Sequence, residues 1–216
     1  MRTTCKPFRN ATKPLAFLLV LTLLFLFSGF VFGQDAEVKK EYWGGGKLKS
    51  EKHYKNGKID GFFTIWHKNG EKHYKTHFKA DKKDGPSAAW YPNGEKRYEK
   101  NYKHGREHGR FTIWYQNGQE EWEAHYKNGA QDGRFTFWYE NGNKKTEEYY
   151  VDGLQDGRFT LWHENGQKDL ELTLKDGRQH GLLIEWYENG KKKTERNYKN
   201  GKEDGLVTEW DENGIV

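Results

Sequence analysis

A 24-residue repeat runs through most of the chain and limits the folds that it can adopt. The clearest copy, Gly-Arg-Phe-Thr-Ile-Trp-Tyr-Gln-Asn-Gly, occupies residues 109–118, and close copies begin at Gly133 and Gly157. Weaker copies begin at Gly61, Gly85, Gly181 and Gly205. No insertion or deletion interrupts this spacing. A fixed period of this size indicates a repeat architecture.

Each unit divides into two strands of different composition. The first is aromatic and β-branched, as in Phe111 to Tyr115, which favours a pleated strand. Asn117-Gly118 follows it and predicts a two-residue type I′ hairpin turn. The second strand, such as residues 120–127, is charged and alternating. No segment of the repeats shows a helical period, so the sequence predicts an all-β chain of about fourteen strands.

The register of these strands follows from the lengths of the two turns. A two-residue turn at Asn117-Gly118 pairs Ile113 with Trp122, Phe111 with Ala124 and Trp114 with Glu121. A four-residue loop at 128–131 pairs Trp122 with Phe137, places Tyr126 over Gly109 and Gly133, and maps each residue onto its equivalent 24 later. A two-residue turn there slips the sheet by two residues per repeat, so we prefer the longer loop.

Both registers assign each side chain to the same face of the sheet, because they differ by two residues and side chains alternate between the faces. We define the aromatic face by Phe111, Ile113, Trp122, Tyr126 and their equivalents in other repeats. We define the Trp face by its tryptophan row and by the polar residues around it in each repeat: Arg110, Thr112, Trp114, Glu121, Glu123, His125.

The repeat at residues 81–104 departs from the others. Pro86, Ser87, Ala88 and Ala89 stand where the others have Arg-Phe-Thr-Ile, so the aromatic face loses two large side chains. Proline is tolerated at the start of a strand. We predict that this unit is the least stable part of the sheet and a point where it bends.

The first 33 residues have the features of a secretory signal peptide. Four basic residues and no acid precede an uncharged run, Leu15 to Phe32, and Val31 and Gly33 suit the small-residue positions before a cleavage point. The alternative is an uncleaved membrane anchor, since about 18 apolar residues is at the lower limit for spanning a bilayer. We divide the chain into a signal peptide (1–33), a short mobile linker (34–41) and about seven repeats (42–216), and expect a secreted, periplasmic or envelope location.

The charge balance and the cysteine content limit the kinds of partner and the compartment that we expect. The chain has 37 Lys plus Arg against 32 Asp plus Glu, and without the four bases of the leader the balance is 33 to 32. A near-neutral surface with interspersed signs argues against nucleic acid, which needs a localised basic surface. The one cysteine, Cys5, lies in the leader, and a mature part without thiols fits an oxidising compartment.

The repeat unit resembles a known family. The motif Asp-Gly-Arg-Phe-Thr-Ile-Trp-Tyr-x-Asn-Gly, a Lys/Glu-rich strand and then Tyr-Lys-Asn-Gly is similar to the MORN-variant repeat of bacterial proteins often labelled YwqK-type antitoxins. This resemblance covers nearly all of residues 42–216. It implies an open, single-layer antiparallel β-meander of tandem hairpins, no enzymatic activity, and a role in protein interaction.

A row of tryptophans is the main candidate for a binding site. Its members recur every 24 residues and share the Trp face: Trp66, Trp90, Trp114, Trp138, Trp162, Trp186, Trp210. The residues expected between neighbouring rings, some of which could make cation–π contacts with them, are His73, Arg97, Glu121, Lys145, Asp169, Lys193. One interpretation is a ladder of aromatic platforms for a sugar, a cationic headgroup or a peptide. The other is structural, since tryptophan stabilises a solvated sheet face across strands.

The sequence offers little for metal binding or catalysis. His53, His77 and His125 are equivalent and therefore two strands apart, too far for one ion, and no zinc or calcium motif is present. We expect no metal, no cofactor and no enzymatic activity. Two functions remain open, an exported scaffold for protein or envelope interaction, with self-association as an option, and a glycan- or cell-wall-binding module. The family label adds a third, an antitoxin or immunity protein.

Overall fold

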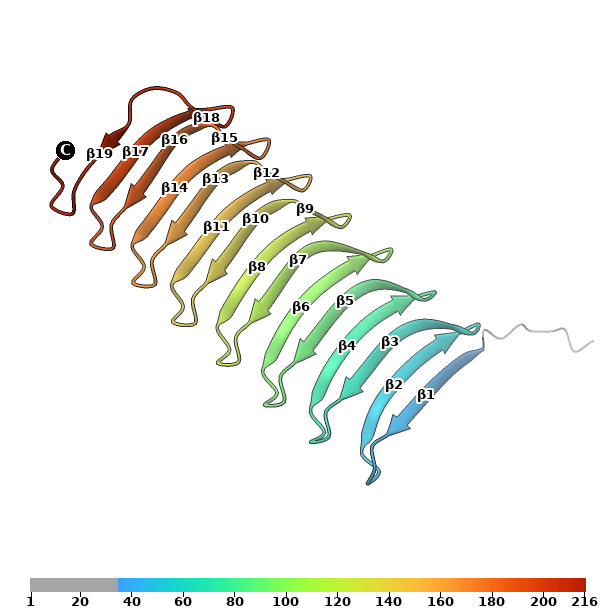
Figure 1. The fold of residues 1–216 in the computed structure, drawn as a ribbon. Helices are drawn as coiled ribbons and strands as arrows, with labels where there is room; N and C mark the ends of the chain where they lie inside the picture. The colour runs from blue at the N-terminus through green and yellow to red at the C-terminus, as the bar shows by residue number, and fades with distance from the viewer. Residues whose placement is uncertain (1–34) are drawn as a thin grey trace, which may run out of the picture. The chain divides into compact units, whose positions relative to one another are not determined.

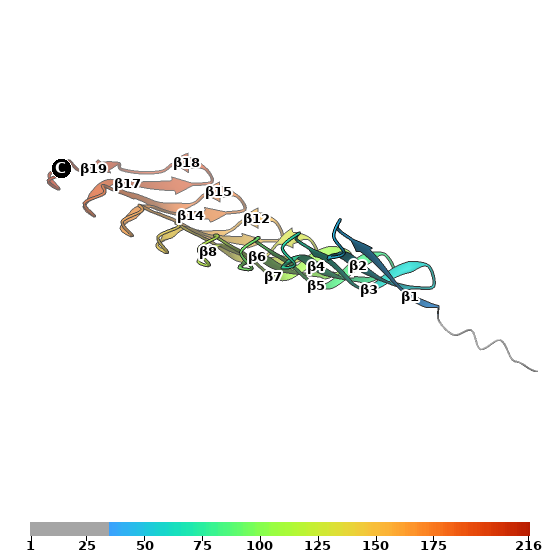
Figure 2. The same cartoon turned by 90° about the horizontal axis from the view of Figure 1, so that it is seen from below.

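The structure is a computed structural model that describes residues 35–216. The predicted signal peptide, and with it Cys5, lies outside the described residues. Residues 36–216 form one sheet of nineteen strands, and residues 35–216 contain no helix. Figure 1 shows the strands arching side by side in chain order, and Figure 2 shows that the sheet has one layer.

The strands are β1 (Ala36–Tyr42), β2 (Leu48–Lys55), β3 (Lys58–Trp66), β4 (Lys72–Lys79), β5 (Lys82–Trp90), β6 (Lys96–Lys103), β7 (Arg106–Trp114), β8 (Glu120–Lys127), β9 (Ala130–Gln131), β10 (Gly133–Trp138), β11 (Lys144–Val151), β12 (Leu154–Gln155), β13 (Gly157–Trp162), β14 (Lys168–Lys175), β15 (Arg178–Gln179), β16 (Gly181–Trp186), β17 (Lys192–Lys199), β18 (Lys202–Glu203) and β19 (Thr208–Glu209). Each long strand pairs antiparallel with the next long strand along the chain, and each of β9, β12, β15 and β18 pairs with the long strand before it. The all-β, open antiparallel meander of 24-residue hairpins is confirmed.

Two expectations about the strands are wrong. Residues 36–42, expected within the linker and a degenerate half-repeat, form β1, because their backbone groups pair with β2 from Ala36↔Lys55 onward. The sheet therefore has one strand position more than the fourteen expected. It counts nineteen strands because four of the first strands of the hairpins are divided into two segments, as β9 and β10 are.

The tight two-residue turn lies at Asn128-Gly129 and not, as predicted, at Asn117-Gly118. Asn128 and Gly129 have φ of 54° and 89°, so the two-residue type I′ turn lies there, between paired Lys127 and Ala130. At the Trp end, the Gly118 N–H donates to the Tyr115 carbonyl (3.0 Å) and only Gly118 has positive φ (87°). This is a three-residue loop with a glycine bulge, a common alternative for the same Asn-Gly signal.

Bulges correct the register that these turns would give. On one side of β8, Ile113↔Trp122 and Phe111↔Ala124 pair as predicted, but Trp114 pairs with Glu120 instead of Glu121. On the other side of β8, the pairs Tyr126↔Gln131 and Glu123↔Thr136 enclose two residues of β8 (124–125) but four residues of the following segment (132–135). The two extra residues restore the predicted pair Trp122↔Phe137. The in-register stacking of repeats is confirmed, although a short turn with a bulge produces it instead of a four-residue loop.

At Gly61 and Gly133, the residue that lies against the bulge glycine is a histidine and not the predicted tyrosine. Tyr126 pairs with Gly109 as expected, but it faces Gln131 and not Gly133. A Cβ on Gly133 would lie 3.4 Å from the Cβ of His125, and one on Gly61 would lie 3.1 Å from that of His53. The equivalent histidines therefore sit against bare backbone at the bulges, which gives them a structural role.

The sheet is most buried along its central rows. On the Trp face, Thr112, Thr136 and Thr160 are nearly inaccessible, and on the aromatic face Ala124 and Phe135 are. In the divergent repeat, β5 remains a continuous strand, and its small residues Ser87 and Ala89 are also buried. That this unit is the least stable remains a prediction.

Candidate functional site

The seven tryptophans of the predicted row lie at equivalent positions, and each is half-buried. Six of them end the first strand of a hairpin, next to a three-residue loop, and Trp210 directly follows β19. Two strand spacings separate neighbouring rings along the sheet, about 9.6 Å. Trp114 shares a hollow with Arg110 and Thr112, which places it on the polar face as predicted.

A lysine lies over most rings of the row. The Nζ atom lies 5.3 to 5.8 Å from the ring centre of a tryptophan in the next hairpin in five pairs: Lys72 with Trp90, Lys96 with Trp114, Lys144 with Trp162, Lys168 with Trp186, Lys192 with Trp210. These distances allow cation–π attraction. The residues that we predicted between the rings follow these lysines by one position in the sequence, as Lys145 follows Lys144. Lys145 and Lys193 contact Tyr139 and Tyr187 instead.

The bulge explains both the error and the contact. Trp114 pairs with Glu120 and not with Glu121. The side chain beside each tryptophan therefore comes from the residue one position earlier in the sequence than predicted. The extra residue also lets a lysine reach the glutamate three residues later, as in Lys144–Glu147 (2.7 Å) and Lys192–Glu195 (2.6 Å). In a regular strand, residues three apart point to opposite faces. The recurring Lys-x-x-Glu in the second strands was the sequence signal for this arrangement.

The middle of the row differs in charge. Glu120 occupies the place that a lysine holds in five other hairpins, and Arg110 bonds Glu120 (3.1 Å) and Glu123 (2.5 Å). In most of the Lys-x-x-Glu pairs the glutamate is less exposed than its lysine, as in Lys144 (44%) and Glu147 (17%). The outer layer of the Trp face is therefore cationic over a carboxylate row.

Shallow hollows recur between the tryptophans. One of 340 Å³ is lined by Trp66 and Trp90 with Glu71, Lys72 and two loop glycines. The equivalent hollow four repeats later, of 440 Å³, is lined by Gln167, Lys168, Trp186, Asn189 and Gly190. Equivalent positions of two distant repeats thus form similar surface hollows.

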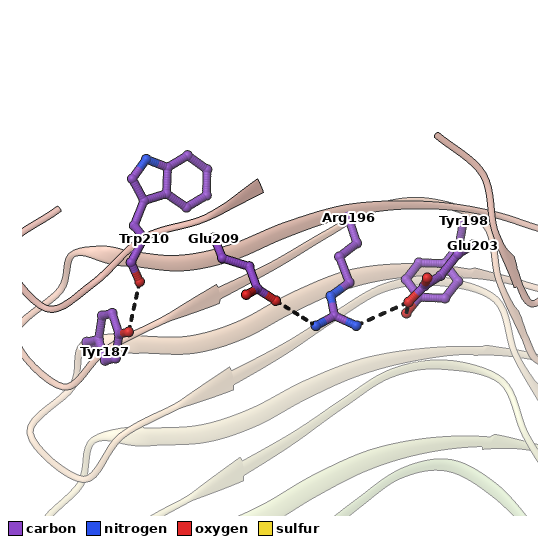
Figure 3. A network of polar contacts seen from close by, with 6 residues as sticks. All are labelled: Tyr187, Arg196, Tyr198, Glu203, Glu209 and Trp210. Carbon is purple, nitrogen blue, oxygen red and sulfur yellow. Dashed lines mark hydrogen bonds and ion pairs between the residues drawn. The ribbon is translucent and has the colours of Figure 1, made fainter. Parts of the chain in front are cut away.

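Polar clamps hold neighbouring loops in place beside the row. A tyrosine hydroxyl donates to the carbonyl of the next tryptophan in four hairpins, as in Tyr115 to Trp138 (2.8 Å) and Tyr187 to Trp210 (2.8 Å; Figure 3). Asparagines of the loops donate to the following loop in the same way, as Asn117 does to the Glu140 carbonyl (3.2 Å). His163 has the tyrosine's position, and its buried Nε2 forms no hydrogen bond within residues 35–216, although Asp169 Oδ1 lies 3.6 Å from it.

The aromatic face is held by ring contacts. The Trp122 ring packs against Phe111 (4.6 Å between centres), Phe137 (5.9 Å) and Phe135 (6.0 Å) in edge-on geometry. Phe135 also contacts Tyr150 at 4.7 Å and is 2% exposed. Such pairs add about 0.5–1.5 kcal/mol beyond the area that they bury. The rings therefore form one continuous cluster across β7, β8, β10 and β11.

Charged side chains interrupt this face in alternate hairpins. Lys100 lies over the Phe111 ring (4.6 Å) and bonds Glu107 (2.8 Å). Burial alone lowers the pKa of Lys100, but its hydrogen bonds to Glu107 and Tyr102 outweigh burial, so that the pKa is raised. Two repeats later, Glu148 accepts from the Tyr150 hydroxyl (2.7 Å), and burial together with this contact raises the pKa of Tyr150 to about 12.

The series ends in a polar group at the C-terminal end of the face. Arg196 bonds Glu203 (3.1 Å) and Glu209 (3.4 Å), whose positions are apolar or amide in the central repeats. Figure 3 shows this guanidinium on one side of the sheet and the Trp210 indole on the other. The aromatic face is thus apolar in its middle and charged at this end.

Two further features of the described chain bear on the predictions. Among residues 35–216, no three His, Cys, Asp or Glu side chains gather as a metal site would require. Within the same range, no helix has the length and hydropathy to cross a membrane.

Comparison with known proteins identifies the repeat. The family described as the MORN repeat variant matches residues 38–56, 83–104, 131–152 and 179–200. These are alternate hairpins, and each contains one of the charged residues at the centre of the aromatic face: Lys52, Lys100, Glu148, Arg196. No curated protein matches the chain.

Proposed function

This chain carries MORN-variant repeats, and we propose that it is a non-catalytic scaffold whose Trp face binds an extended protein partner. Repeat arrays of this kind present long surfaces, because each unit contacts only its neighbours. Fifteen strand positions at about 4.8 Å each give a surface roughly 70 Å long. Such a surface suits a macromolecule better than a small ligand.

One observation carries the proposal: the same group of tryptophan, lysine and glutamate recurs along one face with equivalent hollows between its members. Tryptophan is enriched at binding hot spots, and half-buried rings flanked by shallow hollows can lose more water on contact. The lysines and glutamates beside them supply charges that fix the register of a partner.

The distribution of side chains supports a binding role over a catalytic one. An enzyme requires one asymmetric arrangement of reacting groups in a pocket. Here the residues repeat evenly, and two of the hollows beside the row are shallow and formed by equivalent turns. The near-equal count of bases and acids outside the leader supports a protein over a nucleic acid.

The place of action is part of the proposal. The basic start, the apolar run to Phe32, and Val31 and Gly33 at the small-residue positions support export to the envelope or the exterior. An antitoxin or immunity role is the special case in which the protein partner is a toxin.

A second candidate, an envelope polysaccharide, is favoured by the spacing of the row. Rings repeated at about 9.6 Å match a polymer with a chemical repeat of similar length. Binding would then grow stepwise with the number of polymer units, whereas a folded protein partner gives a single affinity.

The test is capture of envelope material by the wild type and by a variant with Trp114, Trp138 and Trp162 replaced by alanine. The variant should lose at least tenfold in capture of the protein fraction and keep its strand signal in circular dichroism. Capture confined to a protease-treated polysaccharide fraction would favour the second candidate. Undiminished capture by the variant would contradict a role for the row.

A matched control removes apolar side chains elsewhere. Val38, Val151 and Leu154 are 48%, 55% and 57% exposed and lie away from the row, so their replacement by alanine should leave capture unchanged. If the tryptophan variant loses strand signal, replacement of Lys96, Lys144 and Lys168 by glutamate tests the same surface without removing the rings.

A further inference from the structure

The central part of the aromatic face is large enough to be an interface. From β4 to β14, omitting the two-residue strands β9 and β12, nine strands lie side by side. At about 4.8 Å per strand and about 3.3 Å per residue, nine strands by five residues offer roughly 700 Å². One side of a standard protein interface is about 800 Å². Polar residues share this area, but the ring cluster from Tyr98 to Tyr150 within it is continuous, and monomers rarely expose contiguous apolar patches larger than a few hundred Å².

The residues along the middle of this patch are arranged with a symmetry of their own. In strand order the central row reads Thr76, Ser87, Lys100, Phe111, Ala124, Phe135, Glu148, Phe159, Leu172. Ala124 stands at its centre. Counting outward, Phe111 mirrors Phe135, and the base Lys100 mirrors the acid Glu148.

We propose that this face pairs with the same face of a second copy, about a two-fold axis that runs parallel to the strands over Ala124. Rotation about that axis keeps the position along a strand and reverses the strand order. It therefore places Lys100 of each copy opposite Glu148 of the other. This inference goes beyond the scaffold function and does not rest on it.

Charge and size are complementary in this arrangement. Lys100 is 18% exposed, so the pairing covers an ammonium that is already partly desolvated, and it brings a second carboxylate to each lysine. The small Ser87 and Ala89 of the divergent repeat come opposite Phe159 and Leu161 of the second copy. A small residue facing a large one lets two sheets pack at the usual separation of about 10 Å.

In this dimer, each sheet shields the aromatic face of the other from water. Two stacked sheets make a sandwich whose inner faces are the apolar ones. Both Trp faces then point outward, so that the dimer presents two identical binding surfaces. Two linked surfaces raise avidity for a repeated partner without new contacts.

The decisive experiment uses charge reversal and mixing. Lys100→Glu sets a new carboxylate against that of Glu148, and Glu148→Lys sets a new ammonium against that of Lys100, twice in each homodimer. Each variant alone should sediment as a monomer at concentrations where the wild-type chain is a dimer. An equimolar mixture forms heterodimers in which both pairs are again of opposite sign, so the dimer should return.

The mixture separates this register from a general effect of the substitutions. Each variant loses its contacts within the monomer, to Glu107 or to Tyr150, and mixing does not restore those contacts. A mixture that stays monomeric would overturn the proposal, and so would a wild-type chain that sediments as a monomer at 100 micromolar, roughly a thousandfold above the dissociation constants common for interfaces of this size.

A second measurement needs no variant. In one chain, Lys100 and Glu148 lie four strands apart, about 19 Å, beyond direct contact. A zero-length amine-to-carboxyl cross-linker applied to the wild type should give a dimer band containing a Lys100–Glu148 linked peptide. A cross-linked dimer that lacks this peptide would contradict the register.

Discussion

The two faces of the sheet carry the same residue type in different settings. Trp122 on the aromatic face touches three phenylalanine rings, whereas Trp114 on the opposite face lies under the ammonium of Lys96. Both indoles are half-buried. Their accessibility is therefore similar, but the neighbours of Trp122 are apolar and those of Trp114 are charged and can be hydrated. Exposure alone does not separate a packing tryptophan from one available to a partner.

The largest expected effect comes from truncating one indole on each face. Trp122→Ala should lower the free energy of unfolding by about 2–4 kcal/mol, because it opens a cavity among Phe111, Phe135 and Phe137. Trp114→Ala should cost about 1 kcal/mol, since a cation–π contact and partial burial are lost. Urea unfolding followed by circular dichroism measures both. Equal losses would show that the two rings have the same role.

A medium effect should come from the clamps of the Trp side. Tyr139→Phe removes the donor to the Trp162 carbonyl (2.9 Å) and should cost about 1 kcal/mol. His163→Tyr supplies the hydroxyl that this position lacks and should raise stability by about 0.5–1 kcal/mol. Thermal unfolding of the two variants should shift the midpoint in opposite directions. A destabilised His163→Tyr variant would contradict a clamp at that repeat.

The smallest effect is a dependence of stability on alkaline pH, to which Tyr150 on the aromatic face contributes. The pKa of Tyr150 is raised from 10.0 to about 12, first by burial and then by its hydrogen bond to Glu148. The folded state therefore favours the protonated phenol. That contribution is complete below pH 10 and is lost as the pH rises through 12.

Tyr150→Phe tests this origin directly. The variant should lose less stability than the wild type between pH 10 and pH 12, as measured by unfolding at each pH. Tyr149→Phe is a suitable control, because Tyr149 precedes Tyr150 on the same strand and its side chain is 37% exposed. An unchanged alkaline profile for Tyr150→Phe would assign the pH dependence to other groups.

Much of the fold could be predicted because its information is local and repeated. The alternation of Phe111, Thr112, Ile113 and Trp114 assigns each side chain to a face, whichever register applies. Ile113↔Trp122 and Trp122↔Phe137 then follow from the 24-residue period. The row of tryptophans was predicted in the same way, and its role as a binding site remains a proposal.

The errors share a physical cause. Asn-Gly is compatible with a type I′ turn and with a three-residue loop that ends in a bulge, so Asn117-Gly118 and Asn128-Gly129 look alike in sequence but differ in φ. A bulge adds a residue to one strand only and moves every neighbour of the row by one position. The contact between Lys96 and Trp114 was missed for this reason.

The sequence by itself determined the period, the two strand types of each hairpin and the separation of an aromatic face from a tryptophan-bearing one, because these depend on spacing and alternation along one chain. Only the tertiary structure decided which turn is tight, where the bulges lie and which lysine covers each ring. Those features depend on hydrogen bonds between strands, where one inserted residue changes partners without changing the pattern. For the same reason Gly133 lies against His125 and not Tyr126.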